Sequence, residues 1–513
     1  MENINNRDII DVTRPNTWIN LTHLDSHSQK KWLKDNLNDL LKVLSKQPED
    51  SLELWNIIGY ACIDNNLYKE AETIYDTLLN FSQKHHGNIG FPAYLRGIAH
   101  FLQGRFQDAV KDFKIARQFD VQTKNINGAA ARAIAYMEET LFPTREIIKQ
   151  NHAQLLRYLN VQRTLDKTIG PNVLRTLHKW NSATPLFSHG ISQGGGYFLT
   201  LKNKHGQTKG IAIDPGYYFF SIFRDVGLSI ADIDVIIMTH DHDDHTESVE
   251  GMLSLLAKYN DYNEQNKGKV IDIFGSAGTL LKFQGLLSAT DPMGNREINF
   301  KLLVPGSSIT EINGESLLDK HGFTISTFAA HHKERWTNQE SSVGLKLHTN
   351  IKTCLPAGRD VKNGGKLNIG ITGDSRYEVG IGRNFKDVQV LLFNIGSVEK
   401  EEGKFLGQHL GMIGCINLLK EARLGKPLLA ILTEFGEEFS GKREIISRII
   451  ENWSQPMAGG KGRELKVIPA DVHLEVRLDD LNVRETDTNV FFPYTMIEID
   501  ESDSEILKYH FAG

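Results

Sequence analysis

A run of seven residues in the middle of the chain, THDHDDH at positions 239–245, most strongly constrains what this sequence can fold into. It follows the apolar segment DVIIM, which predicts a buried strand, and it precedes a stretch with helical periodicity over residues 247–259. A turn at the end of a strand can project successive side chains into one small volume. The side chains that can converge there are His240, His242, Asp244 and His245. Imidazole and carboxylate groups suit zinc, and also iron or manganese, so the run predicts a site for one or two metal ions.

The second half of the chain has the pattern of a layered α/β domain. From about residue 185, short β-rich segments such as KGIAIDPG, KLNIGITGD and PLLAILTEF alternate with turns and helical stretches. The pattern changes near residue 168, which predicts a boundary between two domains. We place these domains at residues 1–165 and 166–513.

The first half shows helical periodicity from about residue 22 to residue 160 and contains an internal repeat. NNLYKEAETIY aligns without gaps with QGRFQDAVKDF, and the same shift places Gly59 on Gly97 and Tyr75 on Phe113. Small residues let two antiparallel helices approach, and the aromatic rings fill the remaining space. This half resembles tetratricopeptide repeats, which implies a surface for a protein partner or for self-association. A generic helical bundle is the alternative.

The HxHxDH pattern at residues 240–245 is similar to the signature of the metallo-β-lactamase superfamily, and the resemblance extends over residues 186–476. It implies an αββα sandwich with one or two metals at the edge of two facing sheets. His240 and His242 match ligands of the first metal in that family, and Asp244 and His245 match ligands of the second. Asp214 in IAIDPG matches an aspartate that braces the metal-binding loop without ligating.

The third histidine of the first metal is expected from the segment FTISTFAAHHKERW, which offers His331 and His332. We favour His331 because it stands at the usual distance from the strand. His332 is the alternative, since adjacent side chains point in opposite directions on an extended segment. The SSVGLKL segment that follows makes the arrangement similar to the phosphodiesterase branches, which include tRNA 3′-processing ribonucleases and phospholipase D-like members.

Three further residues are assigned through the same resemblance. Asp374 in ITGDS matches the carboxylate that bridges the two metals. Glu434 ends the strand LLAILTE, where the family usually has a histidine; its carboxylate either ligates the second metal or turns away and leaves that site weaker or vacant. His409 in GQHLGMIGC matches a general acid of the ribonuclease-like branches, and a structural helix-cap or surface histidine is the alternative.

These residues together predict a metal-dependent hydrolase. Zinc is the expected metal, with manganese or iron as alternatives. A metal-activated hydroxide is expected as the nucleophile, with Asp244 or Asp374 orienting it and His409 protonating the leaving group. We favour a phosphodiesterase for RNA, a nucleotide or a phospholipid headgroup. The alternatives are hydrolysis of an ester, thioester or lactam, and an interaction protein whose metal domain is regulatory or degenerate.

Composition places few limits on the substrate. The 513 residues include 58 Lys and Arg against 64 Asp and Glu, and the net charge of −6 gives no overall attraction to nucleic acid or an anionic membrane. No apolar run is long enough to predict a transmembrane helix, and the polar start MENINNRDIIDV does not predict a signal peptide. Cys62, Cys354 and Cys415 lie too far apart for a thiolate metal site, so we expect buried thiols in a cytoplasmic protein.

Overall fold

The chain forms two compact units in the computed structural model, Met1–Ala153 and Gln154–Gly513. This division lies before the boundary that the sequence predicts between residues 165 and 166. The structure describes residues 26–44, 52–85, 87, 89–122, 128–159, 163–180, 195–262, 268–288, 297–352, 366–401, 403–422, 429–455, 465–472 and 474–485. Within these ranges, no helix has both the length and the apolar character needed to cross a bilayer.

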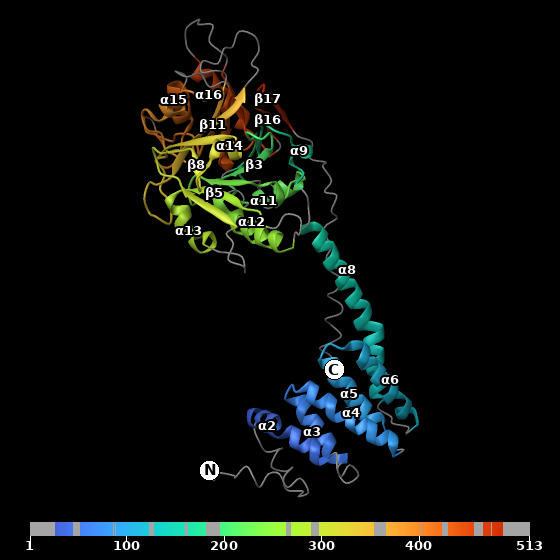
Figure 1. The fold of residues 1–513 in the computed structure, drawn as a ribbon. Coiled ribbons are helices and arrows are strands. Elements are labelled where there is room, and N and C mark those ends of the chain that lie inside the picture. The colour runs from blue at the N-terminus through green and yellow to red at the C-terminus, as the bar shows by residue number, and fades with distance from the viewer. Residues whose placement is uncertain are drawn as a thin grey trace, which may run out of the picture. The chain divides into compact units, whose positions relative to one another are not determined.

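The described part of the first unit is helical, as the sequence predicts (Figure 1). Its elements, with α8 continuing beyond the division, are α2 (Ser26–Leu44), α3 (Leu52–Asp64), α4 (Tyr68–Lys84), α5 (Gly90–Leu102), α6 (Phe106–Gln122), α7 (Ala129–Ala135), the π-helix η3 (Tyr136–Leu141) and α8 (Phe142–Leu159). Helix α5 packs against both α4 and α6. Cys62 on α3 is a buried free thiol, as is Cys415 in the second unit, whereas Cys354 lies outside the described residues.

The two aligned segments of the sequence form helix pairs with the same packing. A Cβ atom added to Gly59 of α3 would lie 2.4 Å from the ring of Tyr75 on α4. A Cβ atom added to Gly97 of α5 would lie 2.6 Å from the ring of Phe113 on α6. Cβ atoms essentially never come this close to another atom, so a larger residue at either position would force the opposing aromatic ring to shift. The likeness to tetratricopeptide repeats stays a prediction.

Two large sheets make up the second unit. In spatial order, the first sheet contains β17 (Asn482–Glu485), β16 (Leu474–Arg477), β1 (Val173–Thr176), β2 (Tyr197–Lys202), β3 (Thr208–Ile213), β4 (Val235–Met238), β5 (Ile271–Gly275) and β6 (Ile298–Leu302). The second sheet contains β15 (Lys466–Pro469), β14 (Leu429–Thr433), β13 (Val390–Asn394), β12 (Lys366–Ile371), β11 (Val343–Lys352), β10 (Phe323–Ala329) and β7 (Ser308–Ile309). A small hairpin pairs β8 (Glu311–Ile312) with β9 (Glu315–Ser316).

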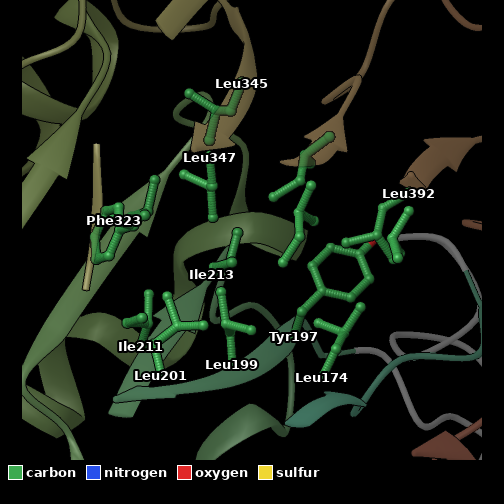
Figure 2. Packing of buried hydrophobic residues seen from close by; sticks show 14 of the residues in the cluster. Leu174, Tyr197, Leu199, Leu201, Ile211, Ile213, Phe323, Leu345, Leu347 and Leu392 are labelled. Carbon is green, nitrogen blue, oxygen red and sulfur yellow. The ribbon is translucent and has the colours of Figure 1, made fainter. Parts of the chain in front are cut away.

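The two sheets pack face to face through one apolar core. Alternate residues of each strand point to opposite faces, so Leu199 and Leu201 of β2 lie in the same cluster as Leu345 and Leu347 of β11. Figure 2 shows these side chains directed toward one another between the sheets. Burial of such residues is the main stabilising contribution to a sandwich of this kind.

Helices cover the outer face of each sheet (Figure 1). The first sheet is covered by α9 (Leu165–Thr168), α11 (Phe219–Asp225), the 3₁₀ helix η4 (Ile230–Asp232), α12 (Asp243–Tyr262) and α13 (Ala277–Leu287). The second is covered by the 3₁₀ helices η5 (Ile381–Phe385) and η6 (Glu437–Phe439), α15 (Met412–Ala422) and α16 (Arg443–Ser454). The short α14 (Leu317–His321) precedes β10. The predicted αββα sandwich is therefore confirmed.

The parallel pairing of strands determines where the polar residues that follow these strands lie. Strands β3, β4 and β5 are parallel, and so are β12, β13, β14 and β15. The carboxyl ends of parallel strands meet at one edge of a sheet. Asp214 directly follows β3, Thr239 follows β4, Asp374 lies shortly after β12, and Glu434 directly follows β14. The distant motifs of the sequence thus come together at the edge of the sandwich.

Candidate metal centre

Two overlapping groups of side chains at this edge have the donor types of metal ligands. One group contains His240, His242, His332 and Asp374, and the other contains Asp244, His245, Asp374 and Glu434. Within each group, one donor atom from every residue lies within 4.8 Å of the others. Asp374 is common to both groups. The arrangement therefore offers two adjacent sites that share one carboxylate.

The loop between β4 and α12 is braced from behind by Asp214. The two carboxylate oxygens of Asp214 accept hydrogen bonds from the backbone N–H and the hydroxyl group of Thr239, at 2.7 and 2.8 Å. Asp214 itself has a φ of 48°, and a Cβ atom at Gly216 would lie 1.4 Å from the carbonyl oxygen of Asp244. A glycine is therefore required at position 216. Asp214 has the bracing role that the resemblance implies, and α12 begins directly beside it.

The structure brings His332 into the first group and leaves His331 outside it. Nε2 of His332 lies 3.2 Å from Nδ1 of His242, and Nδ1 of His332 faces the carbonyl oxygen of Gln408 at 3.0 Å. A backbone carbonyl at Nδ1 favours the tautomer that leaves Nε2 free to ligate. His331 is 33% exposed, and its Nδ1 lies 3.6 Å from Glu340. The expectation favoured His331, so the geometry points to the alternative.

Asp374 reaches both groups through a single oxygen. Its Oδ1 accepts a hydrogen bond of 2.8 Å from Nδ2 of Asn394, at the end of β13. Its Oδ2 lies 3.7 Å from Nε2 of His240 and 3.6 Å from Nε2 of His245. Asn394 therefore fixes one oxygen and leaves the other directed between the two groups, as a bridging ligand requires.

The second group joins the first turn of α12 to the end of β14. Nε2 of His245 lies 3.4 Å from Oδ2 of Asp244 and 3.4 Å from Oε1 of Glu434. Glu434 is buried, has a φ of 59°, and points into the cluster. Of the two arrangements left open by the sequence, the structure therefore has the carboxylate turned inward.

The protonation states of the clustered side chains are compatible with a bound cation. Nε2 of His240 and Nε2 of His245 are buried without a hydrogen-bond partner among the described residues, whereas Nδ1 of His245 lies 3.2 Å from Oδ2 of Asp214. Burial, together with the neighbouring His245, holds the pKa of His240 well below its usual value, so its ring is neutral and its lone pair is free. Burial also disfavours a charged His245, but Glu434, Asp244 and Asp374 raise its pKa well above the usual value. Positive charge is thus favoured among the carboxylates, and a divalent cation fits this donor set.

His178 is a buried member of this region that the sequence analysis did not identify. It follows β1, its side chain is 1% exposed, and its Nε2 lies 3.1 Å from Oε1 of Glu434. Burial alone would lower the pKa of His178, but Glu434 raises it. A histidine two residues after a short β-rich segment, in VLRTLHKW, is the only signal that the sequence carries for it.

His409 lies at the rim of the cluster. Its Nδ1 is 3.5 Å from Oδ2 of Asp374, and its side chain is 37% exposed. Its ring centroid lies 5.0 Å from that of His332. A Cβ atom at Gly396 would lie 2.5 Å from Cβ of His409, so the backbone approaches this residue closely. An imidazole that contacts both the cluster and solvent has the position that a general acid needs.

A cleft of about 540 Å³ opens next to the cluster. It is lined by Tyr217, His242, Asp243, Asp244, Lys333, Glu334, Arg335, Asn338 and Gln408. The two cations come from the loop after β10, which buried carboxylates hold in place. The carboxylate of Asp241 accepts hydrogen bonds from the backbone N–H groups of Arg335 and Trp336, at 2.9 and 2.6 Å. Asp241 therefore positions the wall of the cleft.

Glu334 anchors the same loop from the other side. Its carboxylate accepts a hydrogen bond of 3.1 Å from the backbone N–H of Gly278, and it also contacts the hydroxyl groups of Ser276 and Ser341. Burial raises the pKa of Glu334, although these hydrogen bonds oppose the shift. Lys333 and Arg335, which flank Glu334, are thereby presented to the cleft from a backbone that both carboxylates hold.

Two facing sheets with helices on both outer faces, and a cluster of histidines and carboxylates at their edge, define the metallo-β-lactamase fold. Residues 210–432 match the family model of a beta-lactamase superfamily domain. No curated protein sequence matches the chain.

Several solved structures are similar to part of this chain. The metallo-beta-lactamase fold protein YhfI from Bacillus subtilis has 14% identity and a TM-score of 0.40, covering 61% of this chain and 98% of its own. A long form RNase Z from yeast has 11% identity and a TM-score of 0.38, covering 60% of this chain and 42% of its own. The short form of human tRNase Z has 15% identity and a TM-score of 0.36, covering 61% of this chain and 99% of its own.

Proposed function

We propose that the protein is a metal-dependent hydrolase of phosphodiesters. The observation that carries this proposal is the joining of the ligand cluster to a cleft that displays Lys333, beside Arg335, whose guanidinium lies 3.7 Å from Asp243. A phosphodiester is an anion, and cationic side chains beside the reacting centre orient it and stabilise the charge that develops on its oxygens. A neutral ester, thioester or lactam would bind such cationic side chains less strongly, because it carries no charge.

The proposed ligands of one metal are His240, His242, His332 and Asp374, and those of the other are Asp244, His245, Asp374 and Glu434. Zinc is the metal that we propose for the histidine-rich group. A bound divalent ion supplies Lewis acidity, which lowers the pKa of a coordinated water and neutralises negative charge on the substrate. The carboxylate of Asp244 lines the cleft and is placed to orient the attacking water by accepting a hydrogen bond.

His409 is the proposed general acid. Departure of an alkoxide from phosphorus requires a proton on the leaving oxygen, and an imidazole can supply it near neutral pH. The partly exposed ring lies against Asp374 and beside His332, so it reaches the centre and the solvent at once. The substrate classes that meet these requirements are RNA, a nucleotide and a phospholipid headgroup.

A substrate panel tests the proposal. The purified protein, supplied with Zn²⁺ or Mn²⁺, is expected to hydrolyse bis(p-nitrophenyl) phosphate, and at least one of an RNA oligonucleotide, a cyclic nucleotide and a lysophospholipid diester. Its kcat/KM for these compounds should exceed that for p-nitrophenyl acetate or a thioester. A preference for the acetate or the thioester would overturn the phosphodiesterase assignment and favour acyl hydrolysis.

A matched pair of lysine variants tests the role of the cleft wall. Lys333→Ala is expected to raise KM for phosphodiesters about tenfold, since a hydrogen bond to a charged group contributes about 1.5–3 kcal/mol before solvent screening. Lys204→Ala is the control, because Lys204 is 63% exposed and lies in the turn between β2 and β3, at the opposite end of β3 from Asp214. Equal changes in KM for the two variants would contradict a role for Lys333 in binding the phosphodiester.

We also propose that the helical unit holds tetratricopeptide-like repeats that bind a protein partner or a second copy of the chain. The repeated glycine–aromatic packing of α3–α4 and α5–α6 supports this proposal. Tyr60 of α3 and Phe91 of α5 are 44% and 45% exposed, with ring centroids 6.3 Å apart. Sedimentation velocity over a wide concentration range separates the two occupants: a monomer throughout would leave only a different protein as the partner.

A further inference from the structure

The two halves of the cluster offer different donor atoms. Apart from the shared Asp374, the first half contributes three imidazole nitrogens, from His240, His242 and His332. The second half contributes one imidazole, from His245, and two carboxylates, from Asp244 and Glu434. Imidazole suits zinc, whereas carboxylate oxygens suit harder cations such as Mn²⁺ and Mg²⁺. The halves therefore differ in the property that distinguishes one divalent metal from another.

The shared ligand does not remove this difference. Asn394 holds Oδ1 of Asp374, and only Oδ2 faces the histidines of the two halves. Both metals would therefore meet the same oxygen, and the contrast between the sites comes from the other ligands. Glu434 decides that contrast, because a histidine at this position would give the second half two nitrogen donors.

Glu434 is held in its place by the backbone and by one neighbour. It directly follows β14, and its φ of 59° turns the side chain out of the line of the strand. Its Oε1 lies 3.4 Å from Nε2 of His245 and 3.1 Å from Nε2 of His178. The carboxylate thus lies between an imidazole of the cluster and an imidazole that is not one of the clustered ligands.

His178 is fixed independently of the cluster. Its other ring nitrogen, Nδ1, lies against the backbone of Gly195, whose N–H is 3.1 Å away and whose carbonyl oxygen is also in contact. The residue before it, Leu177, donates its backbone N–H to the carbonyl oxygen of Gly196 at 2.9 Å. The ring of His178 therefore contacts the backbone of Gly195 on one side and Glu434 on the other, as a residue that orients a ligand requires.

We propose that the two halves bind different metals, with zinc in the half that contains His332 and a hard divalent cation, Mn²⁺, in the half that contains Glu434. In this arrangement His178 is a positioning residue: it holds Oε1 of Glu434 toward the second metal and does not itself ligate. The inference rests on the proposed metal-dependent function, but it concerns which cation each half accepts and not which bond is hydrolysed.

Metal titration tests the inference without measuring activity. Metal-free protein is loaded either with one equivalent of Zn²⁺, to fill the first site, or with one equivalent of Mn²⁺, to fill the second. The remaining site is then titrated separately with Mn²⁺ and with Zn²⁺. Mn²⁺ is followed by electron paramagnetic resonance and both metals by calorimetry. Zinc binds most sites more tightly than manganese, so the informative quantity is the ratio of the two dissociation constants, Kd(Mn²⁺)/Kd(Zn²⁺). The inference predicts that this ratio is at least tenfold smaller for the second site than for the first.

Three variants decide which residues are responsible. Glu434→His is expected to raise the ratio at the second site at least tenfold. His178→Leu should weaken binding of Mn²⁺ about 10–100-fold and leave the first zinc in place, as loss of an outer partner of a ligand does. His178→Gln keeps a nitrogen near the position of Nε2 and should recover part of that loss.

The outcomes separate this inference from the proposed function. Equal metal preference at the two sites of the wild-type protein, or an unchanged ratio in Glu434→His and unchanged Mn²⁺ binding in His178→Leu, would overturn the inference even if phosphodiesters are hydrolysed. A mixed zinc–manganese protein that hydrolyses no phosphodiester would retain the inference and overturn the proposed function.

Discussion

Two adjacent histidines, His331 and His332, have opposite environments although the sequence offers the same side chain twice. On this extended segment successive side chains point in opposite directions, so only one of the pair can face the cluster. The backbone at 331 is fixed from both sides, because its N–H donates to the hydroxyl group of Ser375 and its carbonyl oxygen accepts from the N–H of Arg376, at 3.0 and 3.2 Å. That register directs His332 inward. It depends on a neighbouring loop, which the local sequence does not reveal.

This pair provides a matched test of the ligand assignment. His332→Ala is expected to remove the first metal and to lower phosphodiester kcat/KM by at least about 10³-fold, since a metal-dependent reaction loses its electrostatic stabilisation. His331→Ala should retain the metal and most of the activity. Metal content by inductively coupled plasma mass spectrometry and initial rates provide the two measurements; full metal content in His332→Ala would contradict the assignment.

His409 can be tested through the choice of leaving group. Loss of a general acid typically lowers the rate about 10²–10⁴-fold when the leaving oxygen is a basic alkoxide. We expect that loss for His409→Ala with an RNA or alkyl phosphodiester, and a much smaller loss with bis(p-nitrophenyl) phosphate, whose leaving group needs no proton. Metal content should stay unchanged. Equal losses for both kinds of substrate would assign His409 to a structural role.

At the scale of elements, the start of α12 determines the geometry of the second ligand group. Asp244 and His245 lie in the first turn of this helix, and the backbone of Asp244 packs directly against Gly216. Ser248, one turn further on, donates a hydrogen bond of 2.8 Å to the carbonyl oxygen of Gly216. The helix is thus joined to the segment after β3, which also carries Asp214.

Two glycine substitutions separate close packing from helix propensity. Gly216→Ala is expected to destabilise the second unit by about 3 kcal/mol, the upper part of the usual range for overpacking, because the new Cβ atom would lie 1.4 Å from a carbonyl oxygen. Gly251→Ala, within α12, meets no atom within 4 Å and should stabilise by about 0.5–1 kcal/mol. Urea unfolding monitored by circular dichroism measures both; similar stabilities would contradict the close approach at Gly216.

At the scale of the whole molecule, the segment that contains residues 163–165 is held to the first sheet of the second unit. Arg163 pairs with Asp234 at 2.6 Å, and Asp232 accepts hydrogen bonds of 2.8 and 3.0 Å from the backbone N–H groups of Thr164 and Leu165. Asp234 also accepts a hydrogen bond of 2.8 Å from the N–H of Gly210 on β3. This segment of the second unit is thereby attached to the first sheet, at the end opposite the metal cluster.

This attachment gives a pH dependence of stability with a defined sign. Burial opposes the charge of Asp234, but Arg163 and Lys269 lower its pKa below the usual value. The carboxylate therefore stabilises the fold above the pKa of an unfolded aspartate, about 3.9, and this contribution is lost as the pH falls toward the folded value. Asp234→Asn should lower the unfolding free energy at pH 7 by about 1–3 kcal/mol and reduce its decline below about pH 5. If the unfolding free energies of the variant and the wild type changed with pH in the same way, this account would be contradicted.

The sequence by itself determined the layered α/β class of the second half, the helical character of the first, and most residues of the cluster. Strand-end positions such as His240, Asp374 and Glu434 are visible because each follows an apolar segment, and parallel strands bring such ends to one edge. The tertiary structure alone decided that His332 faces inward, that Glu434 turns into the cluster, and that His178 stands behind it. These choices depend on backbone dihedrals and on contacts between segments far apart in the chain, and local residue patterns do not record them.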